Sequence, residues 1–390
     1  MINSAFDFIS TTDLNELVTS QRGESKTLEY KRDFLAETSD DKRKILRTVS
    51  AFANTSGGDL VYGIDAVDGV ATNLTGLSIS DEDGFRLRLE NSIRDGIQPR
   101  IPRLQIKFIP VNGDKKVVVV RVEKSWNAPH RLVQDGHFYA RNSAGTYALD
   151  VGELRQAFSL SETVVERIRS FLALRVSKIQ NNRGAVPLVE GVRVVFEMIP
   201  ISAFSAVPPQ RIELTSDQRN GFQPMGTSST HSRVNLDGFY SYAFGSGDAT
   251  KTYAQVFRNG VVEVVASFGP IEGEAEKPVP ATYIETQLIR LVGSYRRGLF
   301  SAGIEGPFMF FLAILNVTGS KLLTGGAWSE TASLAQNDAD DLVLSEVVAE
   351  SNDFDVAQTL RPLFDSYWNA YGYEKSQNYD EHGLWKPVRG

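Results

Sequence analysis

A helical segment near the middle of the chain limits the possible architectures more than any other part of the sequence. Residues 161–179 read SETVVERIRSFLALRVSKI and have the apolar spacing of a helix. The pattern of strands changes after this segment, and 390 residues are too many for one ordinary core. We therefore expect an N-terminal domain over 1–160, a connecting helix over 161–184 and a C-terminal domain over 185–390.

Both halves combine helix and strand signals. In the first half, residues 40–54 carry an apolar stripe at helical spacing, and residues 81–95 also look helical. DLVYGID, residues 59–65, is expected to be a buried strand, and LQIKFIPV and KKVVVVRVE bracket a hairpin turn at Asn112-Gly113-Asp114. The second half repeats this mixture with the hairpin TYAQVFRNGVVEVVASF and the buried strand PFMFFLAIL. The predicted class is α+β, a mixed α/β domain followed by a second mixed α+β domain.

Composition excludes several classes of protein. No apolar run is long enough to span a membrane, and the N-terminus lacks the basic start of a secretion signal. The chain has no cysteine, so disulfides and thiolate metal sites are excluded and a cytoplasmic location is expected. A net charge of −7 argues against a general nucleic-acid coat and leaves room only for a local basic surface.

The stretch GESKTLEYK, residues 23–31, concentrates charge where a strand begins. Glu29 and Lys31 share one face of that strand because side chains alternate. Glu24 lies in the turn before the strand, and Asp65 ends the buried strand DLVYGID. If the two strands pair, the three carboxylates could converge, and carboxylate oxygens are good ligands for Mg²⁺ or Mn²⁺. A solvated edge strand would carry the same residues, so both interpretations stay open.

Four separated blocks occur in order: GES-KT-LEYK, a helix, AFANTSGGDLVYGID and FYARNSAG. Together they resemble the Schlafen-type AlbA_2 domain over residues 15–158. In the nuclease members of that family, two glutamates and an aspartate cleave tRNA and rRNA. The resemblance assigns Glu24, Glu29 and Asp65 as the catalytic metal ligands, and Lys31 as the matching lysine.

Basic and aromatic residues around these blocks are candidates for contacts with a nucleic-acid backbone. A solvated helix face is the ordinary fate of such residues. In the family, the FYARNS strand flanks the site, which makes Arg141 the best candidate for a phosphate contact. The predicted nucleic-acid-binding residues are Lys26, Arg32, Arg43, Arg47, Tyr139 and Arg141.

The resulting hypothesis is a divalent-metal-dependent endoribonuclease that cleaves structured RNA, most plausibly tRNA, as a homodimer in bacterial anti-phage defence. The C-terminal domain would sense a trigger or a partner. The alternative is a non-catalytic DNA- or RNA-binding transcriptional regulator with the same fold. The sequence has no G-x-x-x-x-G-K-[ST] phosphate loop, no tight histidine spacing for zinc and no G-x-S-x-G motif of a serine hydrolase.

Overall fold

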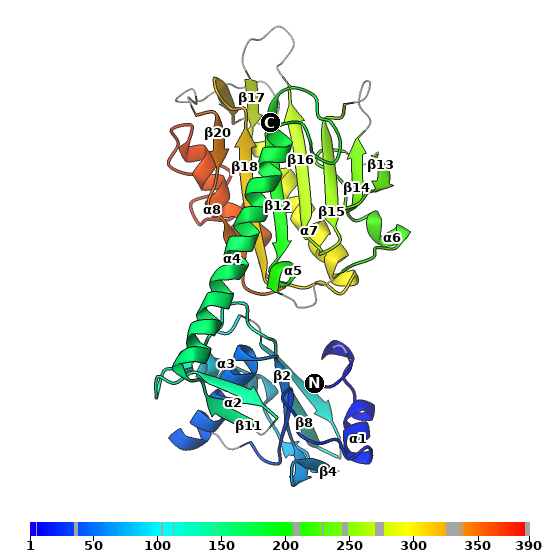
Figure 1. Ribbon diagram of the computed structural model, residues 1–390, viewed down its shortest axis with the longest axis vertical. Coiled ribbons are helices and arrows are strands. Elements are labelled where there is room, and N and C mark those ends of the chain that lie inside the picture. The colour runs from blue at the N-terminus through cyan, green and yellow to red at the C-terminus, as the bar shows by residue number, and fades with distance from the viewer. Residues whose placement is uncertain are drawn as a thin grey trace. The chain divides into compact units, whose positions relative to one another are not determined.

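The computed structural model describes residues 1–4, 6–34, 38–102, 104–111, 113–143, 145–205, 211–227, 230–243, 249–269, 277–324, 337 and 339–386. The chain divides into two compact units, Met1–Val165 and Glu166–Gly390 (Figure 1). Each unit has hydrophobic clusters of its own. No helix in the described part of the chain combines the length and apolar character that a membrane span requires.

The N-terminal unit is built on a five-stranded sheet in the order β1-β2-β8-β5, with β7 also paired to β8. β1 lies at the edge and runs parallel to β2, whereas β8 is antiparallel to β2, β5 and β7. The predicted hairpin of LQIKFIPV and KKVVVVRVE is β7–β8. The strands are β1 (Leu28–Lys31), β2 (Gly58–Tyr62), β5 (Leu77–Ser78), β7 (Leu104–Pro110) and β8 (Lys115–Val122).

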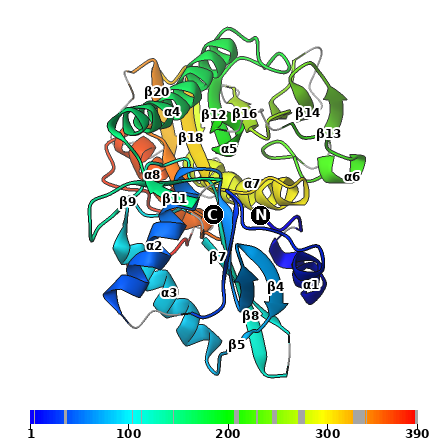
Figure 2. The ribbon, with the colours of Figure 1, turned by 60° about the horizontal axis from the view of Figure 1, so that its bottom comes forward.

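Helices cover both faces of this sheet (Figure 2). Leu28, Tyr30 and Val61 pack on the side of α1, whereas Leu60 and Tyr62 pack with α2 and α3 on the opposite side. The alternation along β1 therefore directs Glu29 toward the α2 side. The helices are a short 3₁₀ turn (Phe6–Phe8), α1 (Thr11–Thr19), α2 (Ser39–Asn54) and α3 (Glu82–Gly96).

The segment DLVYGID is not one strand, which corrects the sequence prediction. β2 ends at Tyr62, and Gly63 adopts a φ of 89°, a conformation that favours glycine. The chain then leaves the main sheet and forms the ribbon β3–β4. Two further ribbons, β6–β9 and β10–β11, complete the unit. The ribbon strands are β3 (Ile64–Val67), β4 (Val70–Leu74), β6 (Ile97–Gln98), β9 (Arg131–Leu132), β10 (Tyr139–Asn142) and β11 (Gly145–Ala148).

The helix α4 (Val151–Gln180) contains most of the predicted connecting helix, 161–184, and extends it toward the N-terminus. It begins directly after Asp150 and continues through the predicted connecting helix without a break. Its second half packs within the C-terminal unit, where Arg175 pairs with Glu263. The predicted connecting helix is thus part of a longer helix that begins within the N-terminal unit and ends at Gln180.

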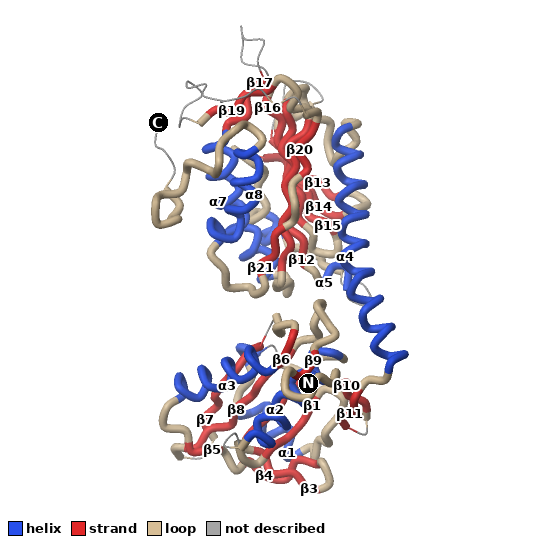
Figure 3. Tube along the Cα trace, turned by 90° about the vertical axis from the view of Figure 1, so that its left-hand side faces the viewer, coloured by secondary structure: helices blue, strands red, loops and turns tan. Residues whose placement is uncertain are grey.

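The C-terminal unit contains an eight-stranded antiparallel sheet in the order β13-β14-β15-β16-β12-β18-β20, with β21 also paired to β18. α7 and α8 lie on one face, and α4 lies on the other (Figure 3). The segment DDLVLSEVVAES, residues 340–351, forms two short strands, β20 and β21. The sheet strands are β12 (Val192–Pro200), β13 (Thr230–Val234), β14 (Gly238–Ala243), β15 (Thr252–Phe257), β16 (Val262–Phe268), β18 (Phe308–Leu315), β20 (Asp341–Val343) and β21 (Val347–Ala349).

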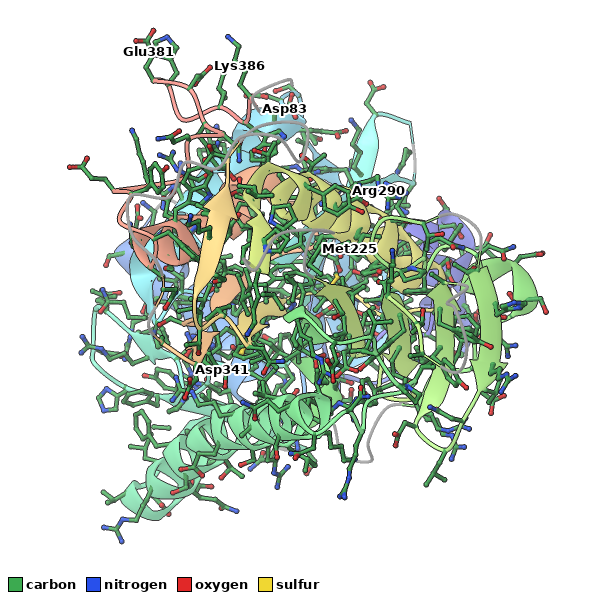
Figure 4. All side chains as sticks on the ribbon, turned by 90° about the horizontal axis from the view of Figure 1, so that it is seen from above. Asp83, Met225, Arg290, Asp341, Glu381 and Lys386 are labelled. Carbon is green, nitrogen blue, oxygen red and sulfur yellow. The ribbon has the colours of Figure 1, made fainter. Side chains whose placement is uncertain are left out.

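The core of this unit lies between the sheet and the pair α7 and α8. Met225 is buried in that core, whereas Glu381 and Lys386 are exposed near its periphery (Figure 4). The parallel pair β17–β19 forms a separate small ribbon. The remaining elements are α5 (Ser202–Ser205), α6 (Ser216–Arg219), β17 (Lys277–Pro280), α7 (Ala281–Ser301), β19 (Ser320–Leu323) and α8 (Val356–Asn369).

Candidate functional site

A pocket of about 310 Å³ lies at the edge of the N-terminal sheet, where β1, α2 and the β10–β11 ribbon meet. Its lining contains four cationic and two anionic side chains, which gives a net charge of +2. The lining residues are Glu24, Glu29, Lys31, Lys44, Arg47, Thr48, Arg141, Gly145 and Thr146. Three of the four predicted catalytic residues, Glu24, Glu29 and Lys31, are therefore together.

The order of strands explains why these elements meet. β1 is an edge strand, so its α2-facing side chains border open space. Lys44 and Thr48 lie one helical turn apart on α2, and Arg47 lies between them, so the three side chains reach the same side of the helix. Arg47 also donates from Nη2 to the Thr146 carbonyl oxygen at 2.8 Å, which attaches the helix to β11.

Glu29 is the central acidic group of the pocket. The residue is only 8% exposed, and its carboxylate pairs with two cations. Lys31 Nζ lies 2.7 Å from Oε1, and Arg141 Nη1 donates to Oε2. Burial raises the pKa of Glu29, but the charges and hydrogen bonds of Lys31 and Arg141 outweigh it, and the net pKa lies below its usual value. Glu29 is therefore held as a carboxylate.

Arg141 is a supporting residue of this pocket. It is 5% exposed, and its guanidinium lies 5.1 Å from the centre of the Phe52 ring. Nε donates to the Ser25 carbonyl oxygen at 3.0 Å, and Nη1 donates to Glu29. These donors are already used inside the protein, so Arg141 positions Glu29. The burial of Arg141 does not favour the direct phosphate contact that the sequence predicted.

Glu24 is exposed and faces the same pocket. The Tyr30 amide donates to its Oε1 at 2.9 Å, so the carboxylate closes the turn that leads into β1. Its own amide donates to the Gly69 carbonyl oxygen at 2.6 Å. The second carboxylate oxygen of Glu24 has no described hydrogen bond, which leaves it available to a ligand.

Asp65 does not line the pocket, which corrects the expectation that three carboxylates converge. The turn at Gly63 carries it out of the main sheet, and it lies on β3 opposite Asn73 of β4. Across the described residues, no group of three or more histidine, aspartate or glutamate side chains could hold a metal ion. The carboxylates as arranged do not fit a Mg²⁺ or Mn²⁺ site of three acidic ligands.

The other predicted contacts are distributed around the unit. Lys26 and Arg32 are exposed and lie outside the pocket lining. Arg43 pairs with Asp135 at 2.9 Å, and the Tyr139 hydroxyl donates to the same carboxylate at 2.8 Å. Tyr139 is 6% exposed and its hydroxyl is used by Asp135, so its burial does not favour the predicted contact with nucleic acid.

The guanidinium of Arg47, another predicted nucleic-acid contact, lies 5.2 Å from the centre of the Tyr139 ring. Tyr139 therefore helps to position Arg47 through a cation–π contact. Thr48 and Thr146 were missed as pocket residues by sequence reasoning. The helical spacing from Lys44 could have identified Thr48, whereas the position of Thr146 depends on the packing of the β10–β11 ribbon against α2.

These features define a small mixed α/β domain with a charged pocket at its sheet edge. Residues 24–150 match the family model described as "Schlafen, AlbA_2". The N-terminal unit therefore contains a Schlafen-type AlbA_2 domain, which confirms the resemblance found in the sequence. No curated protein matches the chain.

Two solved structures resemble part of the chain. The N-terminal domain of a protein related to the ATP-dependent DNA helicase RecG, from Nitrosomonas europaea, is 25% identical, and the match covers 35% of this chain and 88% of that chain with a TM-score of 0.28. The DIP2311 protein from Corynebacterium diphtheriae is 18% identical, and the match covers 37% of this chain and 27% of that chain with a TM-score of 0.27.

Proposed function

We propose that the N-terminal unit binds nucleic acid in this pocket, through the phosphodiester backbone. The observation that carries the proposal is the set of exposed cations, Lys31, Lys44 and Arg47, around one pocket of net positive charge in a chain of net charge −7. Phosphate contacts of this kind supply most of the sequence-independent affinity for nucleic acid. The Schlafen AlbA_2 assignment of the same residues supports nucleic acid as the ligand class.

Each cation is held in a definite position. Lys31 is fixed by Glu29, Lys44 pairs with Asp40 at 2.8 Å, and Arg47 is anchored on the Thr146 carbonyl oxygen. Such anchoring reduces the side-chain entropy that binding must remove. RNA, and tRNA in particular, is the ligand that the family resemblance favours.

A second candidate function is cleavage of the bound RNA, as in the nuclease members of the family. The observation that favours it is that Glu24 and Glu29 line the same pocket as Lys31. The position of Asp65 does not support a preformed three-carboxylate metal site. Metal-dependent hydrolysis is therefore a separate proposal that needs its own measurement. The expected homodimer also needs a measurement of its own.

One experiment tests binding and cleavage together. Purified protein is titrated into labelled total tRNA and into labelled duplex DNA, and binding is followed by fluorescence anisotropy in EDTA. The double substitution of Lys44 and Arg47 by alanine is expected to weaken binding about tenfold or more at low salt and to reduce the salt dependence by about two phosphate contacts. Lys115→Ala, which removes an exposed lysine outside the pocket, is the matched control.

The same protein is then incubated with tRNA and Mn²⁺ or Mg²⁺. Fragments that are absent with EDTA and with Glu29→Ala would establish the endoribonuclease. Intact RNA with retained binding would establish a binding module, and preference for duplex DNA over tRNA would favour the regulator. Equal binding by the pocket variant, the Lys115 control and the parent would refute the pocket as the binding site.

A further inference from the structure

The outer hairpin of the C-terminal sheet carries an aromatic and basic surface. β13 is an edge strand and pairs only with β14 among the described strands. The register places His231 opposite Tyr242 and Arg233 opposite Tyr240, so the four side chains share one face. We call this set, His231, Arg233, Tyr240 and Tyr242, the hairpin surface.

The rings of the hairpin surface form a continuous row. The ring centres of Tyr240 and Tyr242 are 5.8 Å apart, with an angle of 32° between their planes. The ring centre of His231 lies 5.6 Å from that of Tyr242. Tyr240 and Tyr242 are two residues apart on β14, where side chains on one face of a strand follow each other at about 7 Å, so the two rings lie side by side on one face.

The hairpin surface lies on the α4 side of the sheet but beyond the helix. Tyr242 lies opposite Tyr253 of β15, whose hydroxyl donates to Glu263 at 2.9 Å, and Glu263 pairs with Arg175 of α4. In Figure 1, α4 passes in front of β12, whereas β13 and β14 lie at the right-hand edge of the sheet. The tyrosines nearest the edge are therefore only half-buried, while Tyr253 is fully buried.

Three polar groups of the hairpin surface, those of Arg233, Tyr240 and Tyr242, are available to a ligand within the described part of the chain. Among the described residues, the hydroxyls of Tyr240 and Tyr242 and the exposed guanidinium of Arg233 have no hydrogen bond or ion pair. Neither β13 nor β14 contains an aspartate or a glutamate. The acidic residue of the hairpin is Asp237, in the turn between the two strands, and the hairpin surface itself has Arg233 as its charged group, which suits an anionic partner.

We propose that the hairpin surface binds single-stranded nucleic acid, with bases stacked on Tyr240 and Tyr242 and a backbone phosphate paired with Arg233. Aromatic rings that a sheet presents partly to solvent can stack with any base, and a nearby arginine neutralises the backbone. Duplex nucleic acid cannot use these rings, because its bases are already stacked on one another. The site belongs to the C-terminal unit and does not depend on the pocket proposed above.

The test uses the full chain with Lys44 and Arg47 replaced by alanine, so that the N-terminal pocket contributes little. Short labelled oligouridylate and oligothymidylate are titrated in EDTA, and anisotropy is measured. Replacing both Tyr240 and Tyr242 by alanine is expected to weaken binding about tenfold or more, whereas replacing both by phenylalanine keeps the rings and is expected to retain most of the affinity. Ser232→Ala, on the opposite face of β13, is the matched control.

Two further measurements keep the result decisive if the double alanine variant is unstable. Arg233→Ala changes an exposed residue and is expected to reduce the salt dependence by about one phosphate contact. Unlabelled duplex DNA is also expected to compete only weakly with the labelled oligonucleotide for the hairpin surface. The relative affinities for the uridylate and thymidylate strands then separate RNA from DNA as the ligand.

The proposal is overturned if the parent does not bind either oligonucleotide, or if the alanine and phenylalanine variants bind alike. Competition by duplex DNA as effective as competition by single strands would also overturn it, because charge alone would then explain binding. A dimer that sedimentation detects in the parent and that Tyr242→Ala dissociates would assign this face to self-association instead.

Discussion

Glu29 and Arg141 are separated by 112 residues and form a buried ion pair, in which Arg141 Nη1 donates to Glu29 Oε2. The pair joins the edge strand β1 to the β10–β11 ribbon beside α2. A carboxylate in this position keeps its charge only because cations compensate for the loss of water. The pocket is therefore organised around one buried negative charge with positive charges on both sides.

Arg141→Ala is expected to destabilise the protein by about 3 kcal/mol, because Glu29 would lose its buried partner and keep only the half-exposed Lys31. Urea denaturation of the two proteins measures the difference. Arg32→Ala is the control and is expected to change stability by less than about 0.5 kcal/mol, since Arg32 is exposed. Equal stabilities of the Arg141 variant and the parent would show that the ion pair contributes nothing.

Gly63→Ala is expected to cost about 1 to 3 kcal/mol. Gly63 has a φ of 89°, and an added Cβ would lie 2.9 Å from the Gly76 Cα atom. Gly113→Ala is a matched comparison because its φ of 57° is also left-handed but nothing lies within 4 Å of the new Cβ. Thermal denaturation should rank Gly63→Ala as the more damaging change, and the reverse ranking would contradict the tight turn.

Glu197→Met is expected to stabilise the protein by about 1 to 3 kcal/mol. Glu197 is fully buried in β12, and within the described residues no donor reaches its carboxylate oxygens, so its hydrogen bond is the one that its protonated carboxyl donates to Glu263. Burial, and then the charge of the adjacent Glu263, raise its pKa well above the usual value.

The contrasting variant is Glu263→Met, which leaves the buried Arg175 without its partner and is expected to destabilise. Urea midpoints that move in opposite directions for the two variants would support this assignment. A loss of stability in Glu197→Met as large as that in Glu263→Met would show that Glu197 has a structural role that its surroundings do not reveal.

Glu285 predicts a dependence of stability on pH. It is fully buried and accepts hydrogen bonds from Tyr367 at 2.6 Å and Trp368 at 2.5 Å. Burial raises the pKa of Glu285 more than these hydrogen bonds lower it, and the net result is a pKa of about 7 instead of 4.5. Because the folded protein holds this proton more tightly than the unfolded chain, the contribution is complete below pH 4.5 and falls as the pH rises toward about 7.

The free energy of unfolding of the parent, measured by urea denaturation, should fall by about 1 to 3 kcal/mol across this pH window. In Glu285→Gln, which cannot ionise, that component of the slope should disappear. The control is Glu374→Gln, an exposed position, which should retain the slope of the parent. The same slope in all three proteins would exclude Glu285 as its source.

Local sequence patterns predicted much of the fold. α2 and α3 follow from apolar stripes of helical period, and α3 begins one residue after the capping Asp81, whose side chain accepts from the Gly84 amide. The β7–β8 hairpin follows from two apolar runs around a turn. The close spacing of Glu24, Glu29 and Lys31 likewise predicted that they share a site. This prediction needed no knowledge of distant contacts, because β1 and the turn before it position all three side chains.

The parts that failed depend on contacts between distant segments. Alternation along DLVYGID does not reveal that Gly63 turns the chain away, and this turn decides the position of Asp65. The burial of Tyr139 and Arg141 results from packing of β10 against α2, which no local pattern encodes. The sequence pattern around Arg141 therefore gave no sign that this basic residue would be a buried counter-ion.

The position of Lys31 has a consequence for how the pocket responds to a ligand. Its side chain is 47% exposed, and its ammonium already interacts with Glu29. A phosphate bound as proposed would share that ammonium, so more of the charge of Glu29 would be neutralised by Arg141, and the link between β1 and β10 would tighten. Occupancy would then be detectable as slower amide hydrogen exchange along both strands, even with a ligand that touches neither backbone.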